Sequence, residues 1–414
     1  SELSSSINYF QMQTGYMMSS VYFSAATELQ KDILEKLSEK SYVPLEIPEF
    51  YNGYPVTRIG GPKYLTRPVF KNCHSLADIV LPDSVTSIGA EVFKNTAIYR
   101  NDNNWKEGML YIGKFAIDSV GSCDKVLAGT EYIADNAFYN NMGLKSITLP
   151  NTIKRIGDGA FTSCYNLYSV YFGGTQEDWC NIIFDDSTSS NPLYGHGPLY
   201  LNHEKLTELV IKEGTTEVDD RFCRCNSIEK VVLPSSIEIT DLDKLEEAFN
   251  YAEGVYIDFS NCRNLEEINI PYGVTSIGAC AFSDTGLTSI DIPDTVTEIG
   301  NQAFSRSNIT EITIPYGITR IEDYMFQGCE ELTKVNLPNA ITYIGSNAFD
   351  DCEKLTDINI PNSLQYVGYH AFNNCGILND EDNWTGEAFY LGGGLIKVKK
   401  DVKGVYEVKD GVKF

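Results

Sequence analysis

The chain has 414 residues, of which 43% are hydrophobic, and carries a formal net charge of −25. So acidic a surface repels phosphate backbones and anionic lipid, and we therefore expect no nucleic-acid partner. No apolar run approaches the ~18 residues that a membrane-spanning helix needs. We therefore also expect no membrane insertion within these residues.

The N-terminal segment, residues 1–42, does not fit the repeat that fills the rest of the chain. Within it Leu29, Ile33 and Leu37 recur with charged residues between them, which predicts an amphipathic helix. An array of repeats needs its open end covered, so we predict that residues 1–42 form a helical N-terminal cap. The alternative, a helix on a membrane surface, lacks the basic face that anionic lipid attracts.

The repeat begins at residues 45–60 and is copied at 76–93, and between about 98 and 143 its pattern stretches. A second irregular stretch covers about 167–205. There Thr175 can cap a short helix, with Asp178 three residues later and Trp179 turned to the core.

A third departure from the repeat is an insert at about 238–261, which predicts a helix and is the most acidic part of the chain. We interpret the insert as a solvated helix face. A cation or partner site is the alternative, although the residue order of a calcium-binding loop is absent.

Residues 265–375 contain five consecutive copies of the repeat. Its prolines follow one another at steps of 22, 22, 23 and 23 residues: Pro271, Pro293, Pro315, Pro338 and Pro361. Its phenylalanines keep the same steps: Phe282, Phe304, Phe326, Phe349 and Phe372. A fixed period of this length predicts a solenoid of stacked coils, because one such unit cannot bury its own apolar face.

The copy at 287–304 predicts the structure of one coil. Leu287, Ile290 and Ile292 have the inward spacing of a strand, which Pro293 ends because it has no amide hydrogen for a ladder. Stacked strands of this kind form a parallel sheet on one face, with strands ~4.8 Å apart. Glycine turns the chain later in each coil, and Glu322 stands at that position in its own coil. We therefore predict a locally different turn at Glu322.

The motif LxxIxIPxxVTxIGxxAFxxC resembles the leucine-rich repeats of the BspA-like, or Treponema-type, bacterial surface proteins. The resemblance implies a curved right-handed leucine-rich-repeat superhelix over residues 43–414, mostly β with short helical turns. It also implies an exported protein, extracellular or at the cell surface with its signal peptide removed, that binds proteins and is not an enzyme. The stretch at 98–143 looks like the family's enlarged coil, in which an extra hairpin precedes the turn, and 377–414 repeats it. The stretch at 167–205 resembles another recurrent element of these proteins.

Seven of the eleven cysteines occupy one position of the repeat: Cys73, Cys164, Cys225, Cys262, Cys329, Cys352 and Cys375. One small inward position per coil predicts buried free thiols, because a disulfide framework pairs cysteines that are distant in sequence. Bridging between neighbouring coils is the alternative.

No catalytic or metal-binding motif is recognisable in the chain. His196 and His203 have no second ligand at helical spacing, and Cys223 and Cys225 have no further ligands nearby. We therefore expect no enzyme, no cofactor and no metal site.

The predicted binding residues are the outward strand positions of the five copies and two tyrosines that follow strand prolines: Glu267, Asn269, Ser289, Asp291, Glu311, Thr313, Lys334, Asn336, Asp357, Asn359, Tyr272 and Tyr316. From the resemblance we expect a monomer that binds a protein, either a host matrix or plasma protein or another bacterial surface protein. The alternative is that these residues have no binding role, because any sheet face exposed to solvent needs polar residues. Two other functions stay open: a structural spacer that displays another domain, and a module that binds carbohydrate (glycan) through the tyrosines.

Overall fold

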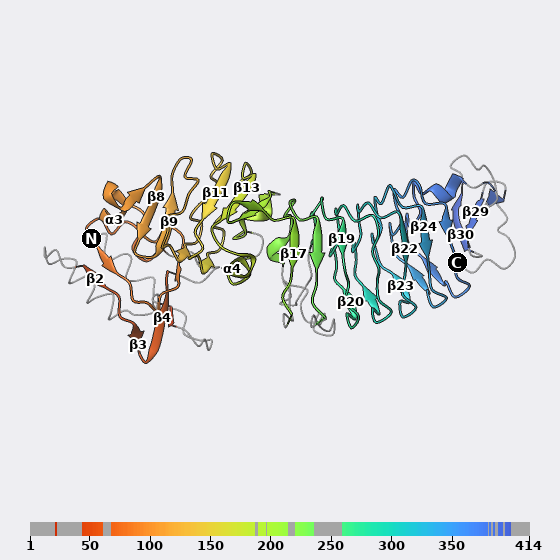
Figure 1. The fold of residues 1–414 in the computed structure, drawn as a ribbon, viewed down its shortest axis with the longest axis horizontal. Coiled ribbons are helices and arrows are strands. Elements are labelled where there is room, and N and C mark those ends of the chain that lie inside the picture. The colour runs from red at the N-terminus through yellow and green to blue at the C-terminus, as the bar shows by residue number, and fades with distance from the viewer. Residues whose placement is uncertain are drawn as a thin grey trace. The chain divides into compact units, whose positions relative to one another are not determined.

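The computed structural model describes residues 21–22, 44–60, 68–186, 189–195, 197–213, 220–235, 259–379, 381, 384–385, 388–391 and 394–398. The chain divides into two compact units, Ser1–Gly195 with Leu199–Glu204, and His196–Pro198 with Lys205–Phe414 (Figure 1). The predicted cap at 1–42, apart from residues 21–22, lies outside the described residues. So do His196 and the predicted insert as far as residue 258.

The first unit is mostly strand with a few short helices. Its helices are α3 (Ala97–Arg100), η2 (Asp102–Asn104), α4 (Gln176–Cys180) and η3 (Pro192–Gly195). Its strands are β1 (Val21–Tyr22), β2 (Leu45–Glu46), β3 (Phe50–Tyr51), β4 (Tyr54–Ile59), β5 (Ile79–Val80), β6 (Ser87–Ile88), β7 (Trp105–Lys106), β8 (Met109–Ile112), β9 (Phe115–Ser119), β10 (Tyr132–Ile133), β11 (Ser146–Leu149), β12 (Arg155–Ile156), β13 (Ser169–Phe172), β14 (Ile183–Phe184) and β15 (Leu199–Leu201). A two-residue strand, β16 (Glu204–Lys205), has its first residue in the first unit and its second residue in the second unit.

The second unit has the same character, with short strands and two 3-10 helices, η4 (Asp220–Phe222) and η6 (Gly376–Asn379). Its strands are β17 (Glu208–Val210), β18 (Lys230–Val232), β19 (Glu267–Ile268), β20 (Ser276–Ile277), β21 (Glu298–Ile299), β22 (Glu311–Thr313), β23 (Arg320–Ile321), β24 (Lys334–Asn336), β25 (Tyr343–Ile344), β26 (Asp357–Ile358), β27 (Tyr366–Val367), β28 (Trp384–Thr385), β29 (Ala388–Leu391) and β30 (Gly394–Val398).

Successive coils pair in parallel, and their strands form two ladders in the second unit. The first ladder contains the sheets β17–β18–β19 and β22–β24–β26, and the second contains β20–β21 and β23–β25–β27. The parallel sheets that the repeat predicts are therefore present. Parallel strands in register also place equivalent residues of neighbouring coils side by side, which builds the core and the outward columns described below.

Both stretches predicted as enlarged coils contain an antiparallel hairpin. Strands β7, β8 and β9 pair antiparallel in the first unit, and β28, β29 and β30 do so in the second. The indole Nε1 of Trp105 donates to the Tyr99 carbonyl at 2.7 Å, and that of Trp384 donates to the Leu378 carbonyl at 2.8 Å. The two hairpins therefore share an anchoring contact as well as a strand pattern.

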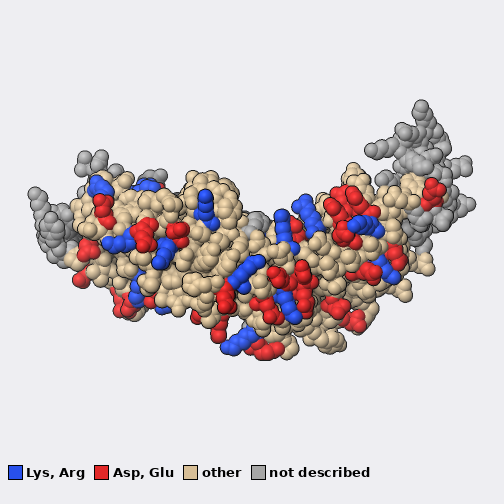
Figure 2. Space-filling model, turned by 45° about the horizontal axis from the view of Figure 1, so that its top comes forward, with Lys and Arg blue, Asp and Glu red and all other residues tan. Residues whose placement is uncertain are grey.

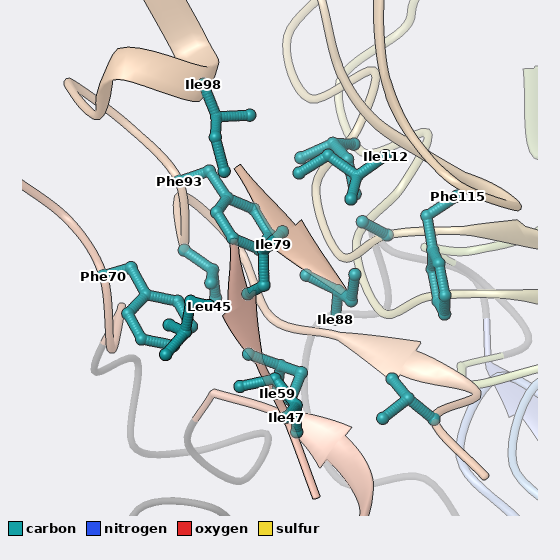
Figure 3. Packing of buried hydrophobic residues seen from close by; sticks show 14 of the residues in the cluster. Leu45, Ile47, Ile59, Phe70, Ile79, Ile88, Phe93, Ile98, Ile112 and Phe115 are labelled. Atoms are coloured by element: carbon teal, nitrogen blue, oxygen red, sulfur yellow. The ribbon is translucent and has the colours of Figure 1, made fainter. Parts of the chain in front are cut away.

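The core of the first unit consists of aliphatic and aromatic side chains from successive coils (Figure 3). The Phe93 ring stacks on Phe70 with centroids 5.8 Å apart. The predicted helix cap is confirmed in α4, where the Thr175 hydroxyl accepts from the Asp178 amide and the Asp178 carboxylate accepts from the Thr175 amide. This cap turns Trp179 into the core, where it is fully buried.

In the second unit the five repeated phenylalanines form one buried column. Phe326 and Phe349 are fully buried, and their nearly parallel rings have centroids 5.4 Å apart. The same stacking joins Phe282 to Phe304, Phe304 to Phe326 and Phe349 to Phe372. Stacking at these spacings is a favoured geometry of aromatic pairs, so the rings join the cores of successive coils.

All eleven cysteines are free thiols, and six of the seven in the repeat position are buried, while Cys73 is half-buried. Four of the six buried thiols, those of Cys164, Cys262, Cys329 and Cys352, bond to the preceding coil. Cys329 Sγ donates to the Phe304 carbonyl at 3.0 Å, and Cys352 Sγ donates to the Phe326 carbonyl at 3.1 Å. The position is therefore suited to cysteine because it needs a small side chain with a donor, and a disulfide plays no part.

The glycine position controls how closely neighbouring coils approach in the second ladder. A Cβ on Gly345 would lie 2.6 Å from the backbone nitrogen of Asp323, and one on Gly300 would lie 2.6 Å from that of Ala279. Glu322 carries a Cβ at this position, and the second ladder is interrupted there, because β21 does not pair with β23 within the continuously described stretch 259–379.

The turn at Glu322 itself is regular, contrary to our prediction. Tyr324, two residues later, has φ 60°. The equivalent residues of the coils on either side have similar values, 59° for Gln302 and 53° for Asn347. A turn depends on its own dihedral angles, whereas the Cβ of Glu322 acts on the distance to the preceding coil. The departure from the repeat therefore changes the pairing of the coils and leaves the turn unchanged.

Candidate binding face

The strand face of the second unit presents columns of outward side chains from residues 208–210, 230–232, 267–269, 289–291, 311–313, 334–336 and 357–359. Because the strands pair in register, Glu311, Lys334 and Asp357 lie side by side in one column, and Thr313 and Asn336 in the next. All twelve predicted binding residues are described; Lys334 is partly exposed and the other eleven are exposed.

Lysines neutralise acidic neighbours along the first column. Lys230 Nζ lies 3.0 Å from the Glu267 carboxylate, and Lys334 Nζ lies 3.2 Å from the Asp357 carboxylate. The hydrogen bond that Lys230 donates to the Glu267 carboxylate also raises the pKa of Lys230. On the surface that Figure 2 shows, basic side chains accordingly lie beside acidic ones in many places.

Asn269 and Asn359, two of the three asparagines at the second outward position, bond to the backbone of the neighbouring coil. The Asn269 amide accepts from the Leu233 backbone N–H at 2.8 Å and donates to the Leu233 carbonyl at 3.1 Å. Asn359 makes the same two bonds to Leu337, at 2.7 and 2.8 Å. These two predicted binding residues are exposed, but their hydrogen-bonding groups already serve the ladder.

A hollow of about 500 Å³ lies on the strand face over β22. Its walls come from three consecutive coils and combine polar outward residues with parts of the apolar strand: Ser289, Ile290, Asp291, Ile292, Asp294, Glu311, Ile312, Thr313, Ile314, Pro315, Tyr316, Asn336, Leu337 and Pro338. The first ladder is interrupted beside it, since residues 289–292 form no paired strand between β19 and β22.

The hollow is acidic and contains no lysine or arginine. Asp291, Asp294 and Glu311 line it, and within the described part of the chain none of the three forms an ion pair. Lys334, which lies beside Glu311 in register, is ion-paired with Asp357 on its other side. The hollow therefore concentrates negative charge that the protein leaves uncompensated.

Two tyrosines stand out from the same face. Tyr272 is 81% exposed and Tyr316 is 70% exposed, and the Tyr316 ring borders the hollow. Exposed tyrosine rings supply contact area at a small cost in side-chain freedom, which makes them common anchors in binding surfaces.

The hollow brings together six of the predicted binding residues: Ser289, Asp291, Glu311, Thr313, Asn336 and Tyr316. The other six lie outside its walls: Glu267, Asn269, Tyr272, Lys334, Asp357 and Asn359. Sequence reasoning missed Asp294, although the signal was available. Asp294 follows Pro293 as Tyr272 follows Pro271 and Tyr316 follows Pro315, so the position after each proline belongs to the same face.

Among the described residues, no group of three or more His, Cys, Asp or Glu side chains is placed to hold a metal ion. His203 is exposed in a tight turn with φ 73°. No helix in the described part of the chain is long and apolar enough to cross a bilayer.

Parallel ladders of short strands on a repeat of 22 or 23 residues, with a buried phenylalanine column, define a leucine-rich-repeat protein. The family model of the BspA-type leucine-rich-repeat region matches residues 63–191 and 257–379, in six copies. The match covers more than half of the chain, and the chain therefore belongs to this family.

Among solved structures, the chain is similar to a leucine-rich cell surface protein from Faecalibacterium prausnitzii, with 21% identity, 80% of this chain and 85% of that chain covered, and a TM-score of 0.40. It is also similar to a leucine-rich-repeat protein from Bacteroides ovatus, with 21% identity, the same coverages and a TM-score of 0.33. A third is the pneumococcal vaccine antigen PcpA, with 16% identity, 78% and 88% covered, and a TM-score of 0.37. No curated protein matches the chain.

Proposed function

We propose that this chain is a non-enzymatic interaction module of a bacterial surface or secreted protein, and that it binds a protein partner on the strand face of its second unit. In this proposal the repeats form a right-handed solenoid, the N-terminal segment caps it, and the chain acts as a monomer outside the cell. Family membership supports a protein-binding role, since leucine-rich repeats serve widely as scaffolds for binding surfaces.

The observation that carries the proposal is the hollow of about 500 Å³ on the strand face. Part of its wall stands on β22 and β24, whose inward residues Ile312 and Val335 are buried in the core. A surface held in this way needs little ordering when it binds, which favours affinity. A volume within the rough range of 300–1,000 Å³ suits a few inserted side chains of a partner.

The test is capture of immobilised matrix and plasma proteins, and of intact bacteria, by the intact chain. A blocking variant carries Thr313→Tyr and Asn336→Tyr in the hollow. A matched control carries Thr319→Tyr and Gln365→Tyr, two exposed positions outside the strand face. We expect the blocking variant to lose capture and the control to retain it, with both folded by circular dichroism. No capture by the intact chain, or equal capture by both variants, contradicts the proposal.

A further inference from the structure

The charge pattern of the strand face indicates what kind of partner the hollow accepts. The outward carboxylates of Glu267 and Asp357 are paired with lysines of this chain, whereas those of Asp291, Asp294 and Glu311 are not. Three carboxylates that share one hollow repel each other, so a cation that enters it relieves this repulsion as well as forming new ion pairs.

Residue 291 lacks a side-chain contact that two other coils make at this position. At the equivalent position Asn269 and Asn359 each accept one hydrogen bond from the neighbouring coil and donate another to it. An ionised aspartate accepts but cannot donate, so Asp291 cannot make this pair of bonds. Its carboxylate stays exposed in the hollow, beside the interruption of the first ladder.

The aromatic border of the hollow favours arginine over lysine as the incoming cation. Tyr316 is 70% exposed and lines the hollow together with the carboxylates. A guanidinium group can stack on a tyrosine ring while its planar fork of donors reaches carboxylates beside the ring. This chain already contains that stacking elsewhere, since the Arg320 guanidinium lies 3.7 Å from the centroid of the Tyr343 ring.

We propose that the hollow formed by Asp291, Asp294, Glu311 and Tyr316 receives an arginine side chain from an extended basic segment of the partner protein. This inference rests on the proposed function, because it names the chemistry of the partner that the strand face binds. The carboxylates hold the guanidinium by charge-assisted hydrogen bonds, and Tyr316 covers its face.

The first test measures binding of three labelled synthetic peptides to the intact chain by fluorescence anisotropy. In each peptide every second residue is glycine or serine. The residues between them are all arginine in the first peptide, all glutamine in the second and all glutamate in the third. We expect the arginine peptide to bind and the other two to bind at least about tenfold more weakly. Added salt should weaken the binding of the arginine peptide. Equal binding of the glutamine or glutamate peptide, or binding of none, overturns the inference.

The second test removes the charges without disturbing the coils. The variant carries Asp291→Thr, Asp294→Asn and Glu311→Ser. Other coils of the repeat have these residues at the same positions, as Thr313, Asn339 and Ser289. We expect it to bind the arginine peptide at least about tenfold more weakly. The control loses three exposed acids elsewhere, by Asp124→Asn, Glu330→Gln and Glu353→Gln, and retains the binding.

The two proposals fail in different ways. If the charge variant still captures the same proteins as the intact chain and the blocking variant does not, the strand face binds a partner by other contacts. The arginine inference then falls and the proposed function stands. If neither variant changes protein capture, the proposed function falls. Equal weakening of peptide binding in the charge variant and its control shows a nonspecific effect of net charge and overturns the inference.

Discussion

At the residue scale, the repeated cysteines join neighbouring coils through their thiols. In the second unit the thiols of Cys262, Cys329 and Cys352 donate to carbonyls of the preceding coil. Each of these carbonyls also accepts a backbone N–H of its own coil, so the thiol adds a second hydrogen bond across the coils. The burial of the thiols disfavours the thiolate, which raises the pKa of Cys329 to about 11 and that of Cys352 well above 9.0.

This raised pKa predicts a loss of stability in alkali. The folded protein holds the Cys329 proton more tightly than the unfolded chain does. The contribution of this thiol to the free energy of unfolding is therefore complete below about pH 9 and is lost as the pH rises toward 11. We expect the free energy of urea unfolding to fall over this interval. It should fall less steeply in Cys329→Ala, which has no thiol to ionise. An equal slope in the two proteins would contradict the prediction.

At the scale of the element, the second ladder is interrupted at the coil in which Glu322 replaces the glycine. Backbone N–H groups at the glycine position normally bond across the second ladder, as Gly300 does to Ile277 at 2.9 Å and Gly345 to Ile321 at 2.7 Å. Glu322 makes no such bond to Ile299 within residues 259–379, and its carboxylate pairs with Arg320 at 2.7 Å instead. The ladder is therefore interrupted where the glycine is replaced.

We expect Glu322→Gly to restore the pairing of β21 with β23. Regained hydrogen bonds contribute about 1 kcal/mol each, and glycine costs about 0.5–1 kcal/mol in chain entropy, so the net change in stability is small. The sensitive measurement is amide hydrogen exchange at residue 322, which should slow. Glu322→Ala is the control, because it removes the charge and keeps the Cβ, and its exchange should remain fast. Slower exchange in both variants would show that the carboxylate, and not the Cβ, keeps the coils apart.

At the scale of the whole molecule, stability is distributed along columns that run through successive coils. Phe349 stacks between Phe326 and Phe372 with centroids 5.4 and 5.3 Å away. Each coil therefore depends on its two neighbours for most of its buried contacts, which is the behaviour of a repeat array.

Phe349→Ala should cost roughly 3–5 kcal/mol, because the ring is fully buried and leaves a cavity between two others. Hydrogen exchange should accelerate most in the coils that carry Phe326 and Phe372 and less in coils further away. Phe349→Leu is the milder control, since it leaves a smaller void. Uniform acceleration over the second unit would show that the unit unfolds as a single cooperative block.

Much of this arrangement could be predicted from the sequence, because the repeated residues report the same environment several times. The inward phenylalanines, the thiol position and the cap at Thr175 all follow from local spacing. The hollow could not be predicted, because it depends on residues that depart from the repeat. The effect of Glu322 lies in the distance between its Cβ and the neighbouring backbone, which spacing alone does not contain. Asp294 was missed for a simpler reason, since only the tyrosines after the prolines drew attention.

The interruptions of the two ladders fall close together, beside residues 289–292 in one and between β21 and β23 in the other. Fewer backbone bonds therefore resist separation of these coils than of the coils from 309 to 375. Under tension along the array, we expect these coils to separate before those from 309 to 375. The acidic hollow adjoins them, so an occupant that spans neighbouring coils would brace the second unit at this seam.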